Sequence, residues 1–319
     1  MLGKGFSCSL VGLEDPQALD GDRVGGKFRS QAKLAQLGFR VPNAFCITAD
    51  MLTRLLLGAD SSNEPSHLQS PASSSSGIPW GDSRKIVLED AILPAIPDSL
   101  AKEILNRTQS MRWPLVVRSS AVVEDGSFRS YAGMFESILG VRTEPELINA
   151  VRRCWASASA PRVSIYAEKM GEKRTIFKVA VICQELVNAK CGGVMFTQDP
   201  VDGSPIFSIE ACWGLPSLVM SGEITPDRVD VFRDGRILKT VIGSRKKVLA
   251  WSDGRVETRR ATKLEEDTLC LSVDEIQLLL TQGLRIEQAF GNPQDIEWAF
   301  DAHNLFILQS RPITSVKRG

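Results

Sequence analysis

The spacing of apolar residues along the chain changes repeatedly between a helical and a strand-like pattern. Residues 27–37 carry one apolar helical stripe that ends at Gly38, and residues 146–156 repeat that spacing. A nearly continuous apolar run over 178–187 predicts a buried strand. Further strands are expected over 41–48, 114–120, 192–197, 227–232 and 237–242. This alternation predicts a mixed α+β protein with two lobes.

A helix start is visible in the last quarter of the chain. Ser272 is followed three residues later by Glu275, the spacing of a capping box, in which each side chain bonds the other residue's backbone N–H. An apolar stripe then continues to Ile286, so a long amphipathic helix is expected there.

Two apolar runs near the C-terminal end predict a β-hairpin. They cover residues 295–299 and 305–314, and the polar segment 301–304 has the composition of a turn. Strand alternation points Asp295 and Glu297 to the same face of the first run.

Gln309 and Arg311 close the second run with the same spacing of two. The hairpin would therefore gather a carboxylate, an amide oxygen and a guanidinium on one face. Oxygen ligands suit Mg²⁺ and an arginine suits phosphate, which are the needs of a nucleoside triphosphate. A surface hairpin with an ion pair would show the same residues.

The overall composition describes an ordinary soluble globular protein. Of 319 residues, 43% are hydrophobic and 24% charged, and 38 basic residues balance 38 acidic ones. A net charge of zero gives no reason to expect nucleic acid or an anionic membrane as a partner. No apolar run approaches a membrane span, and residues 1–6 lack the apolar core of a signal peptide. The seven cysteines, without C-x-x-C spacing, indicate reduced, buried thiols in a cytoplasmic protein.

One segment has the composition of a loop. Residues 59–83 are rich in serine and proline and have too few apolar side chains to offset the entropy cost of ordering. We expect a flexible Ser-rich loop there, either an inert insertion or a lid.

Four segments are candidates for holding a nucleotide. Lys27 follows two glycines at a helix start, Arg118 ends a strand, and Gly133 lies between aromatic and apolar residues that could cover a triphosphate. Gln184 and the backbone of residues 185–187 end the buried strand, where unpaired backbone groups could bind adenine. Each also has a plain structural interpretation: a glycine turn, a solvated arginine, a hairpin tip and a strand exit.

Together these segments resemble a known family: the nucleotide-binding domain of phosphoenolpyruvate synthase, pyruvate phosphate dikinase and rifampin phosphotransferase. The resemblance covers essentially the whole chain, in order. The matching stretches are residues 24–27, 41–45, 117–125, 131–133, 193–200, 213–215, 221–227, 295–299 and 309–314.

The resemblance implies an ATP-grasp-like fold with MgATP between two lobes. The lobes would be residues 1–185 and residues 186–319, the second carrying the metal site. By position, Lys27 and Arg118 would hold phosphates, and Arg311 would contact the transferring phosphoryl group. Glu297 and Gln309 would bind Mg²⁺.

The resemblance also implies a base site and a loop over the triphosphate. The Gly133 loop would cover the phosphates, with Ser137 where the family has threonine. Gln184 and the following backbone, Glu185 to Val187, would bind adenine.

In this family the ATP domain passes a phosphoryl group to a histidine on a separate swivelling domain. The two histidines, His67 and His303, lack that phosphohistidine context. We therefore expect an ATP-dependent phosphotransferase of the kinase or dikinase type. Its acceptor would be a partner phosphohistidine domain or a small molecule.

One departure from the family pattern favours an alternative. The chain has Pro216-Ser217 where the family usually has Gly-Glu, so a glutamate and a flexible glycine are missing. The alternative is a nucleotide-binding or sensing module without turnover.

Overall fold

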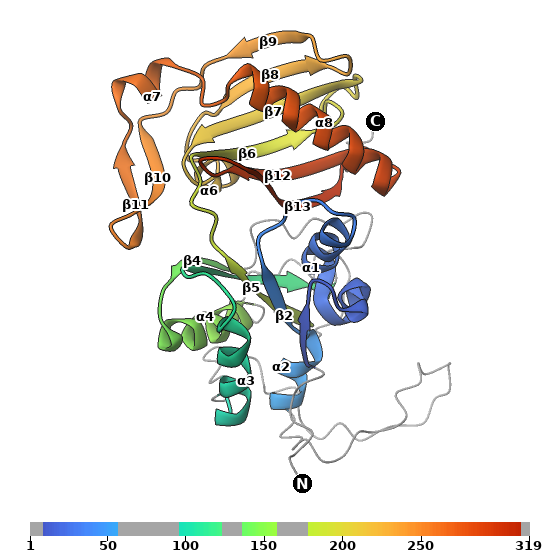
Figure 1. Ribbon diagram of the computed structural model, residues 1–319, viewed down its shortest axis with the longest axis vertical. Coiled ribbons are helices and arrows are strands. Elements are labelled where there is room, and N and C mark those ends of the chain that lie inside the picture. Colours follow the sequence, from blue (N-terminus) through green and yellow to red (C-terminus); the bar gives the residue numbers. More distant parts are fainter. Residues whose placement is uncertain (1–8, 57–95, 123–135, 158–177, 314–319) are drawn as a thin grey trace, which may run out of the picture.

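The computed structural model describes residues 9–56, 96–122, 136–157 and 178–313. Two antiparallel sheets form two lobes, one above the other in Figure 1. The mixed α+β architecture expected from the sequence is confirmed. The C-terminal sheet carries α8 (Val273–Phe290) on one face, whereas the N-terminal sheet carries helices on both faces. The predicted Ser-rich loop over 59–83 lies outside the described residues.

The N-terminal lobe is built on a five-stranded sheet in the order β1-β2-β5-β3-β4. Its strands are β1 (Leu10–Gly12), β2 (Ala44–Ile47), β3 (Leu115–Ala121), β4 (Ser137–Val141) and β5 (Val179–Glu185). Its helices are the short 3-10 helix η2 (Pro16–Leu19), α1 (Gly21–Gln36), α2 (Ala49–Leu56), α3 (Asp98–Thr108) and α4 (Glu144–Ser157). Every residue of β5 is buried, as its continuous apolar run predicts.

The C-terminal lobe is built on a six-stranded sheet in the order β13-β12-β6-β7-β8-β9. Its strands are β6 (Cys191–Phe196), β7 (Ile206–Trp213), β8 (Asp227–Phe232), β9 (Ile237–Val241), β12 (Gln294–Phe300) and β13 (Leu305–Pro312). A separate pair, β10 (Lys247–Ser252) and β11 (Arg255–Arg260), forms a hairpin of its own. The helices are α6 (Ser217–Met220), α7 (Lys263–Asp267) and α8 (Val273–Phe290).

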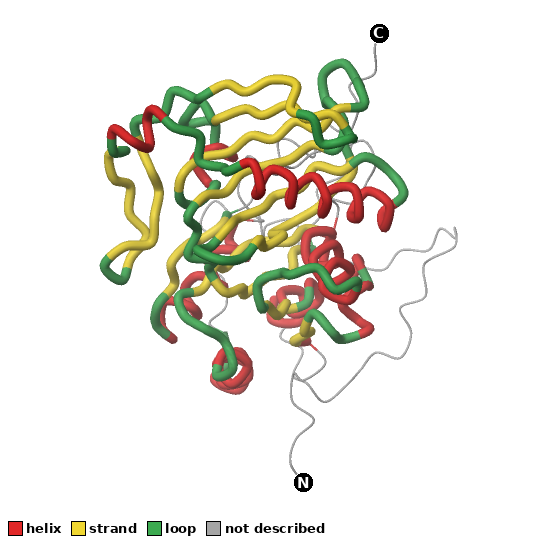
Figure 2. The backbone as a smooth tube through the Cα atoms, turned by 45° about the horizontal axis from the view of Figure 1, so that its top comes forward, coloured by secondary structure: helices red, strands yellow, loops and turns green. Residues whose placement is uncertain are grey.

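Helix α8 covers one face of the C-terminal sheet, as Figure 2 shows. Its capping box, expected from Ser272 and Glu275, is present, and a left-handed Gly291 ends it. The buried side of the helix packs on alternate residues of the strands, among them Phe207, Ile296 and the fully buried Trp298. The residues between them therefore face away from α8.

Helix α1 lies on the side of the N-terminal sheet that faces the C-terminal lobe. Its buried residues Val24 and Phe28 pack with Ile182 of β5, whereas α3 and α4 pack on the opposite face. Ser30 of α1 donates a hydrogen bond through its hydroxyl to the backbone carbonyl oxygen of Ser310 in β13. This helix consequently contacts both lobes, as its position in Figure 1 shows.

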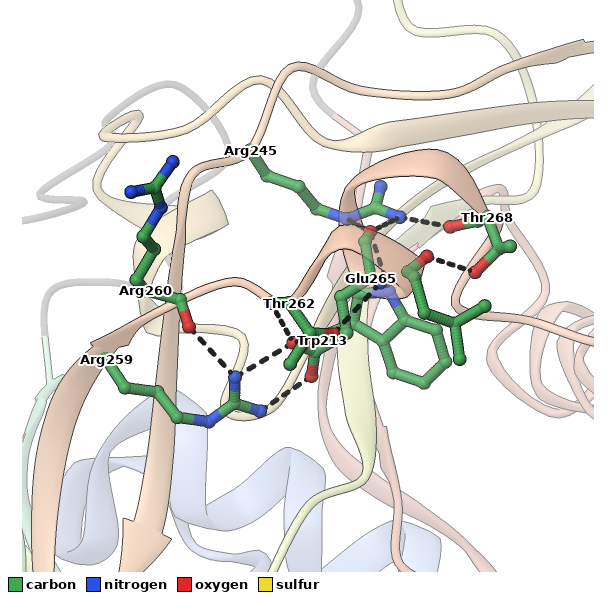
Figure 3. Close-up of polar contacts among 8 residues, drawn as sticks. Trp213, Arg245, Arg259, Arg260, Thr262, Glu265 and Thr268 are labelled. Atoms are coloured by element: carbon green, nitrogen blue, oxygen red, sulfur yellow. Dashed lines mark hydrogen bonds and ion pairs between the residues drawn. The ribbon is translucent and has the colours of Figure 1, made fainter.

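A buried ion pair anchors the base of the β10–β11 hairpin. The side chains of Arg245 and Asp227 are 0% and 1% exposed, and the Arg245 guanidinium donates to the Asp227 carboxylate. It also donates to the backbone oxygens of Glu265 and Thr268, which follow the hairpin (Figure 3). The chain before β10 and the chain after β11 are therefore joined to each other and to β8. No helix within the described parts of the chain is long and apolar enough to cross a membrane.

Candidate functional site

The hairpin predicted from the last apolar runs is present as β12 and β13. Glu297 lies directly opposite Gln309, and Asp295 lies opposite Arg311. Directly opposed residues share a face of an antiparallel pair, so all four side chains lie on the face turned away from α8. Here Arg311 donates through Nε to an Asp295 carboxylate oxygen at 2.8 Å. Sequence reasoning had named Asp295 only as sharing this face, without a role.

Asp295 is a buried carboxylate beside Arg311. The residue is 8% exposed, and its Oδ1 atom has no hydrogen-bond partner within the part of the chain that the structure describes. Burial raises the pKa of this carboxyl, while Arg311 lowers it and Glu297 raises it further. A buried oxygen without a partner is costly, so Asp295 is a candidate for binding a cation.

Arg118 brings the N-terminal lobe to this hairpin. It lies in β3 on the side of the sheet that carries α1, and its Nη2 donates to the side-chain oxygen of Gln309. The two residues are 191 positions apart in the sequence. The contact unites the arginine and the amide that the sequence proposed separately.

Lys27 approaches the same end of β3 through a close packing of α1. Gly25 has a left-handed φ of 71°, and a Cβ there would lie 2.4 Å from the Ser120 backbone oxygen, so only glycine fits. The Lys27 ammonium is then held 3.5 Å from the Ser119 backbone oxygen, one residue beyond Arg118. Two cationic side chains from different elements therefore lie beside the end of β3.

Ser137 starts β4 directly opposite Arg118, on the edge of the N-terminal sheet, and is exposed. The predicted cover loop around Gly133 lies outside the described residues.

The end of β5 supplies a polar hinge between the lobes. The Gln184 side-chain oxygen accepts from Gln31 of α1 at 3.0 Å, and the Glu185 carboxylate accepts from Arg112. The backbone amides of residues 185 and 186 donate within the N-terminal lobe. Among the described residues, no backbone acceptor is found for the Val187 amide. The Glu185 side chain is bonded to Arg112 of its own lobe, so only the backbone of Glu185 is available to a ligand.

Beyond this hinge lies an apolar patch that we call the hinge cluster. It contains buried Ala189, Leu215 and Ala299 with partly buried Leu139, Leu186, Val187, Leu249, Val256 and Leu308. Ala299 follows Glu297 by two in β12, on the same face, and Leu308 precedes Gln309. The polar row of β12 and β13 thus runs directly into an apolar surface.

The donor set fits a divalent cation only with help from a ligand. No group of three or more His, Cys, Asp or Glu side chains suited to a metal occurs in the described residues. Glu297 and Gln309 offer two opposed oxygens, with the unpartnered Asp295 oxygen beside them. Mg²⁺ is commonly held by one or two carboxylates together with substrate phosphates, so this incomplete set suits a metal–nucleotide complex.

A scan of family models matches residues 21–319 to the pyruvate phosphate dikinase AMP/ATP-binding domain. The chain belongs to this family. The resemblance inferred from sequence motifs is thereby confirmed, as is an ATP-binding domain.

Three curated relatives show how much of a larger protein this domain represents. A probable phosphoenolpyruvate synthase of Archaeoglobus fulgidus is 38% identical over 64% of this chain and 27% of its own length. The probable phosphoenolpyruvate synthase of Methanocaldococcus jannaschii is 31% identical over 99% of this chain and 28% of its own length. A rifampicin phosphotransferase of a Streptomyces species is 30% identical over 96% of this chain and 36% of its own length. The chain thus spans about a third of these relatives.

Proposed function

We propose that this dikinase-type domain binds MgATP between its two lobes and transfers a phosphoryl group from it to an acceptor. The observation that carries the proposal is the meeting of Arg118 with Gln309, opposite Glu297. It unites a guanidinium from one lobe with the amide and carboxylate oxygens of the other. Phosphoryl transfer depends on positioning and charge neutralisation, so these side-chain types are sufficient.

The proposed metal-binding and phosphate-binding residues are separate sets of side chains. Glu297 and Gln309 would hold Mg²⁺, which neutralises phosphate charge when bound. Lys27, Arg118 and Arg311 would hold phosphate oxygens, because a guanidinium matches a phosphate with paired N–H donors and an ammonium adds a point charge. Ser137 would donate a hydroxyl to the same phosphates.

The adenine base would lie next to the hinge, beyond the polar residues of β12 and β13. The Val187 amide would donate to adenine at the hinge, and the Gln184 amide group would support that segment from the α1 side. The hinge cluster offers apolar area for the ring. Each end of ATP would thereby find a matching surface.

The phosphoryl acceptor would come from outside the described site. His303 lies in the β12–β13 turn, where its backbone amide donates to Asp301, and His67 lies outside the described residues. We propose a phosphohistidine on a swivelling domain as the acceptor, by analogy with the family, or a small molecule bound directly.

A product analysis tests the proposal. The purified chain is incubated with MgATP and a cell metabolite extract, and AMP, ADP and phosphate are resolved over time. AMP with phosphate indicates dikinase chemistry, and ADP alone indicates a simple kinase. Glu297→Ala should abolish either product, whereas Glu266→Ala, a glutamate on α7 far along the chain from this row, should not. Turnover that survives Glu297→Ala would contradict the proposed metal site.

A second candidate is a nucleotide-binding module without turnover. It is favoured by Pro216, which packs against Gly192 so closely that a Cβ there would lie 3.0 Å from the proline ring. A proline that packs on β6 therefore replaces the flexible glycine of the family pattern. ATP binding with no product under any acceptor condition would favour this candidate over the first.

A further inference from the structure

The β10–β11 hairpin belongs to neither large sheet, yet it contacts both lobes. It leaves the C-terminal lobe and reaches β4 at the edge of the N-terminal sheet, as Figure 1 shows. It was not predicted from the sequence, because its strands mix charged and apolar residues without a clear period. Its two contact points explain how it is held.

The base of the hairpin is fixed to the C-terminal lobe. The Leu215 amide donates to the Leu249 backbone oxygen at 2.7 Å, and Gly214 forms a bridge with the same residue. Gly214 has a left-handed φ of 76°, and a Cβ there would lie 2.2 Å from that oxygen. With the buried Arg245 beneath it, this end of the hairpin is rigid.

The far end packs against the N-terminal lobe. Arg142 donates through Nη1 to the Gly254 backbone oxygen at 3.1 Å. Gly140 of β4 lies under the hairpin, and a Cβ there would come within 2.8 Å of Val256 and 3.3 Å of Trp251. The absence of a side chain at Gly140 therefore permits the close approach of the two lobes here.

One face of the hairpin completes the hinge cluster. Leu249 is paired with Thr258 and Trp251 with Val256, so alternation puts these four side chains on one face. Leu249 and Val256 join the cluster with Leu139 of β4. Both are only partly buried, so they keep apolar surface available for a further group.

The position of this surface identifies what would cover it. In β4 a bulge turns Ile138 and Val141 to the lobe core, so Ser137 and Leu139 face the other lobe. Leu139 thus follows the phosphate-side Ser137, as Ala299 follows Glu297 on the facing strand. A nucleotide whose phosphates bind the polar residues of β12 and β13 would place its purine ring against the hairpin.

We propose that the β10–β11 hairpin is a third wall of the nucleotide site, with Leu249 and Val256 contacting the purine base. This inference rests on the proposed function. The base, once bound, packs against the hinge, β12 and the hairpin together, and the hairpin in turn rests on β4. Occupancy of the base site consequently holds the two lobes together through a contact separate from the phosphates.

Calorimetric binding of two ligands separates the base contact from the phosphate contacts. ATP carries both parts, and inorganic tripolyphosphate carries only the phosphates. We expect Leu249→Ala and Val256→Ala each to weaken ATP binding at least fivefold and to leave tripolyphosphate binding within twofold. Arg118→Ala should weaken both ligands. Arg255→Ala, on the opposite face of the hairpin and paired with Glu257, should change neither.

A second readout keeps the test independent of folding defects. Trp251 lies on the proposed base-facing side, so its fluorescence should change on addition of ATP and not of tripolyphosphate, and Trp251→Phe should remove that change. If wild-type protein binds ATP but both hairpin variants and the Trp251 signal are indifferent to the base, the inference is wrong and the proposed function stands. If wild-type protein binds neither ligand, both are wrong.

Discussion

The buried Arg245–Asp227 pair allows a stability prediction of defined size. Arg245→Met keeps most of the side-chain volume but removes the charge opposite Asp227 and the donors to the carbonyl oxygens of Glu265 and Thr268. Breaking one partner of a buried pair costs about 3–5 kcal/mol, because the other charge stays buried. The orphaned carbonyls act in the same direction, each with up to about 1–3 kcal/mol, although such terms are not additive.

Thermal unfolding measures this loss. An unfolding entropy of about 2.1 cal/mol/K per residue gives roughly 1.5 °C of midpoint per kcal/mol for 319 residues unfolding as one unit. Arg245→Met should therefore lower Tm by about 5–8 °C.

A neighbouring arginine is a matched control. Arg259 donates to the Glu265 carboxylate, but its side chain is 40% exposed. Exposed pairs contribute about 0–1 kcal/mol, so Arg259→Met should lower Tm by no more than about 1.5 °C. Equal shifts for the two variants would refute the reasoning that burial, and not charge pairing alone, sets the cost.

Three further substitutions test separate features. Arg259 lowers the pKa of Glu265 to about 2, so this carboxylate stabilises the fold above its unfolded pKa near 4.5. That stability is lost as the pH falls toward 2. Glu265→Gln should therefore reduce the loss of unfolding free energy between pH 4.5 and pH 2, measured by urea titration. Burial raises the pKa of Glu210, so its ionisation opposes folding at neutral pH, and Glu210→Gln should raise the free energy of unfolding at pH 7 but not at pH 3. Gly140→Ala should cost more than Gly222→Ala, since both have a left-handed φ near 70° but only Gly140 has neighbours within 4 Å; equal Tm shifts would contradict the proposed close approach.

The elements that the sequence predicted correctly share a strong local signal. The capping box at Ser272, the continuous run of β5 and the alternation in 295–299 each depend on residues close together in the chain. Helix α1 begins at Gly21, earlier than the expected residue 27, because its first turns are separated by the non-helical Gly25. A period of 3.6 residues cannot be followed through such a break.

The candidate site was only partly readable for a related reason. Motif residues such as Arg118 and Gln309 could be named from spacing and resemblance, but their contact joins positions 191 apart. The buried oxygen of Asp295 and the cluster around Val187 depend on tertiary packing, which the spacing of residues along the chain does not show. Glycines 140 and 214 carry no sequence signal for a close approach, since a glycine in a turn is indistinguishable from one beneath a hairpin.

The Arg118–Gln309 contact also predicts the order in which the site fills. The Gln309 oxygen that would face Mg²⁺ already accepts a hydrogen bond from a guanidinium, and two cations beside one amide oxygen repel each other unless an anion joins them. Phosphates supply that anion, so Mg²⁺ alone should bind weakly and the MgATP complex tightly. Calorimetry with Mg²⁺, with and without a non-hydrolysable ATP analogue, measures the difference.

Removal of the Arg118 guanidinium tests whether it competes with Mg²⁺ for Gln309. Arg118→Ala should strengthen the binding of Mg²⁺ alone while weakening that of the nucleotide, an inversion that a general loss of structure could not produce. Arg142→Ala, which removes the N-terminal-lobe arginine that donates to Gly254 at the hairpin tip, should leave the affinity for Mg²⁺ alone unchanged. Tight binding of Mg²⁺ to the wild-type chain without nucleotide would show that Glu297, Gln309 and Asp295 form a complete metal site by themselves, and the shared role of the phosphates would have to be abandoned.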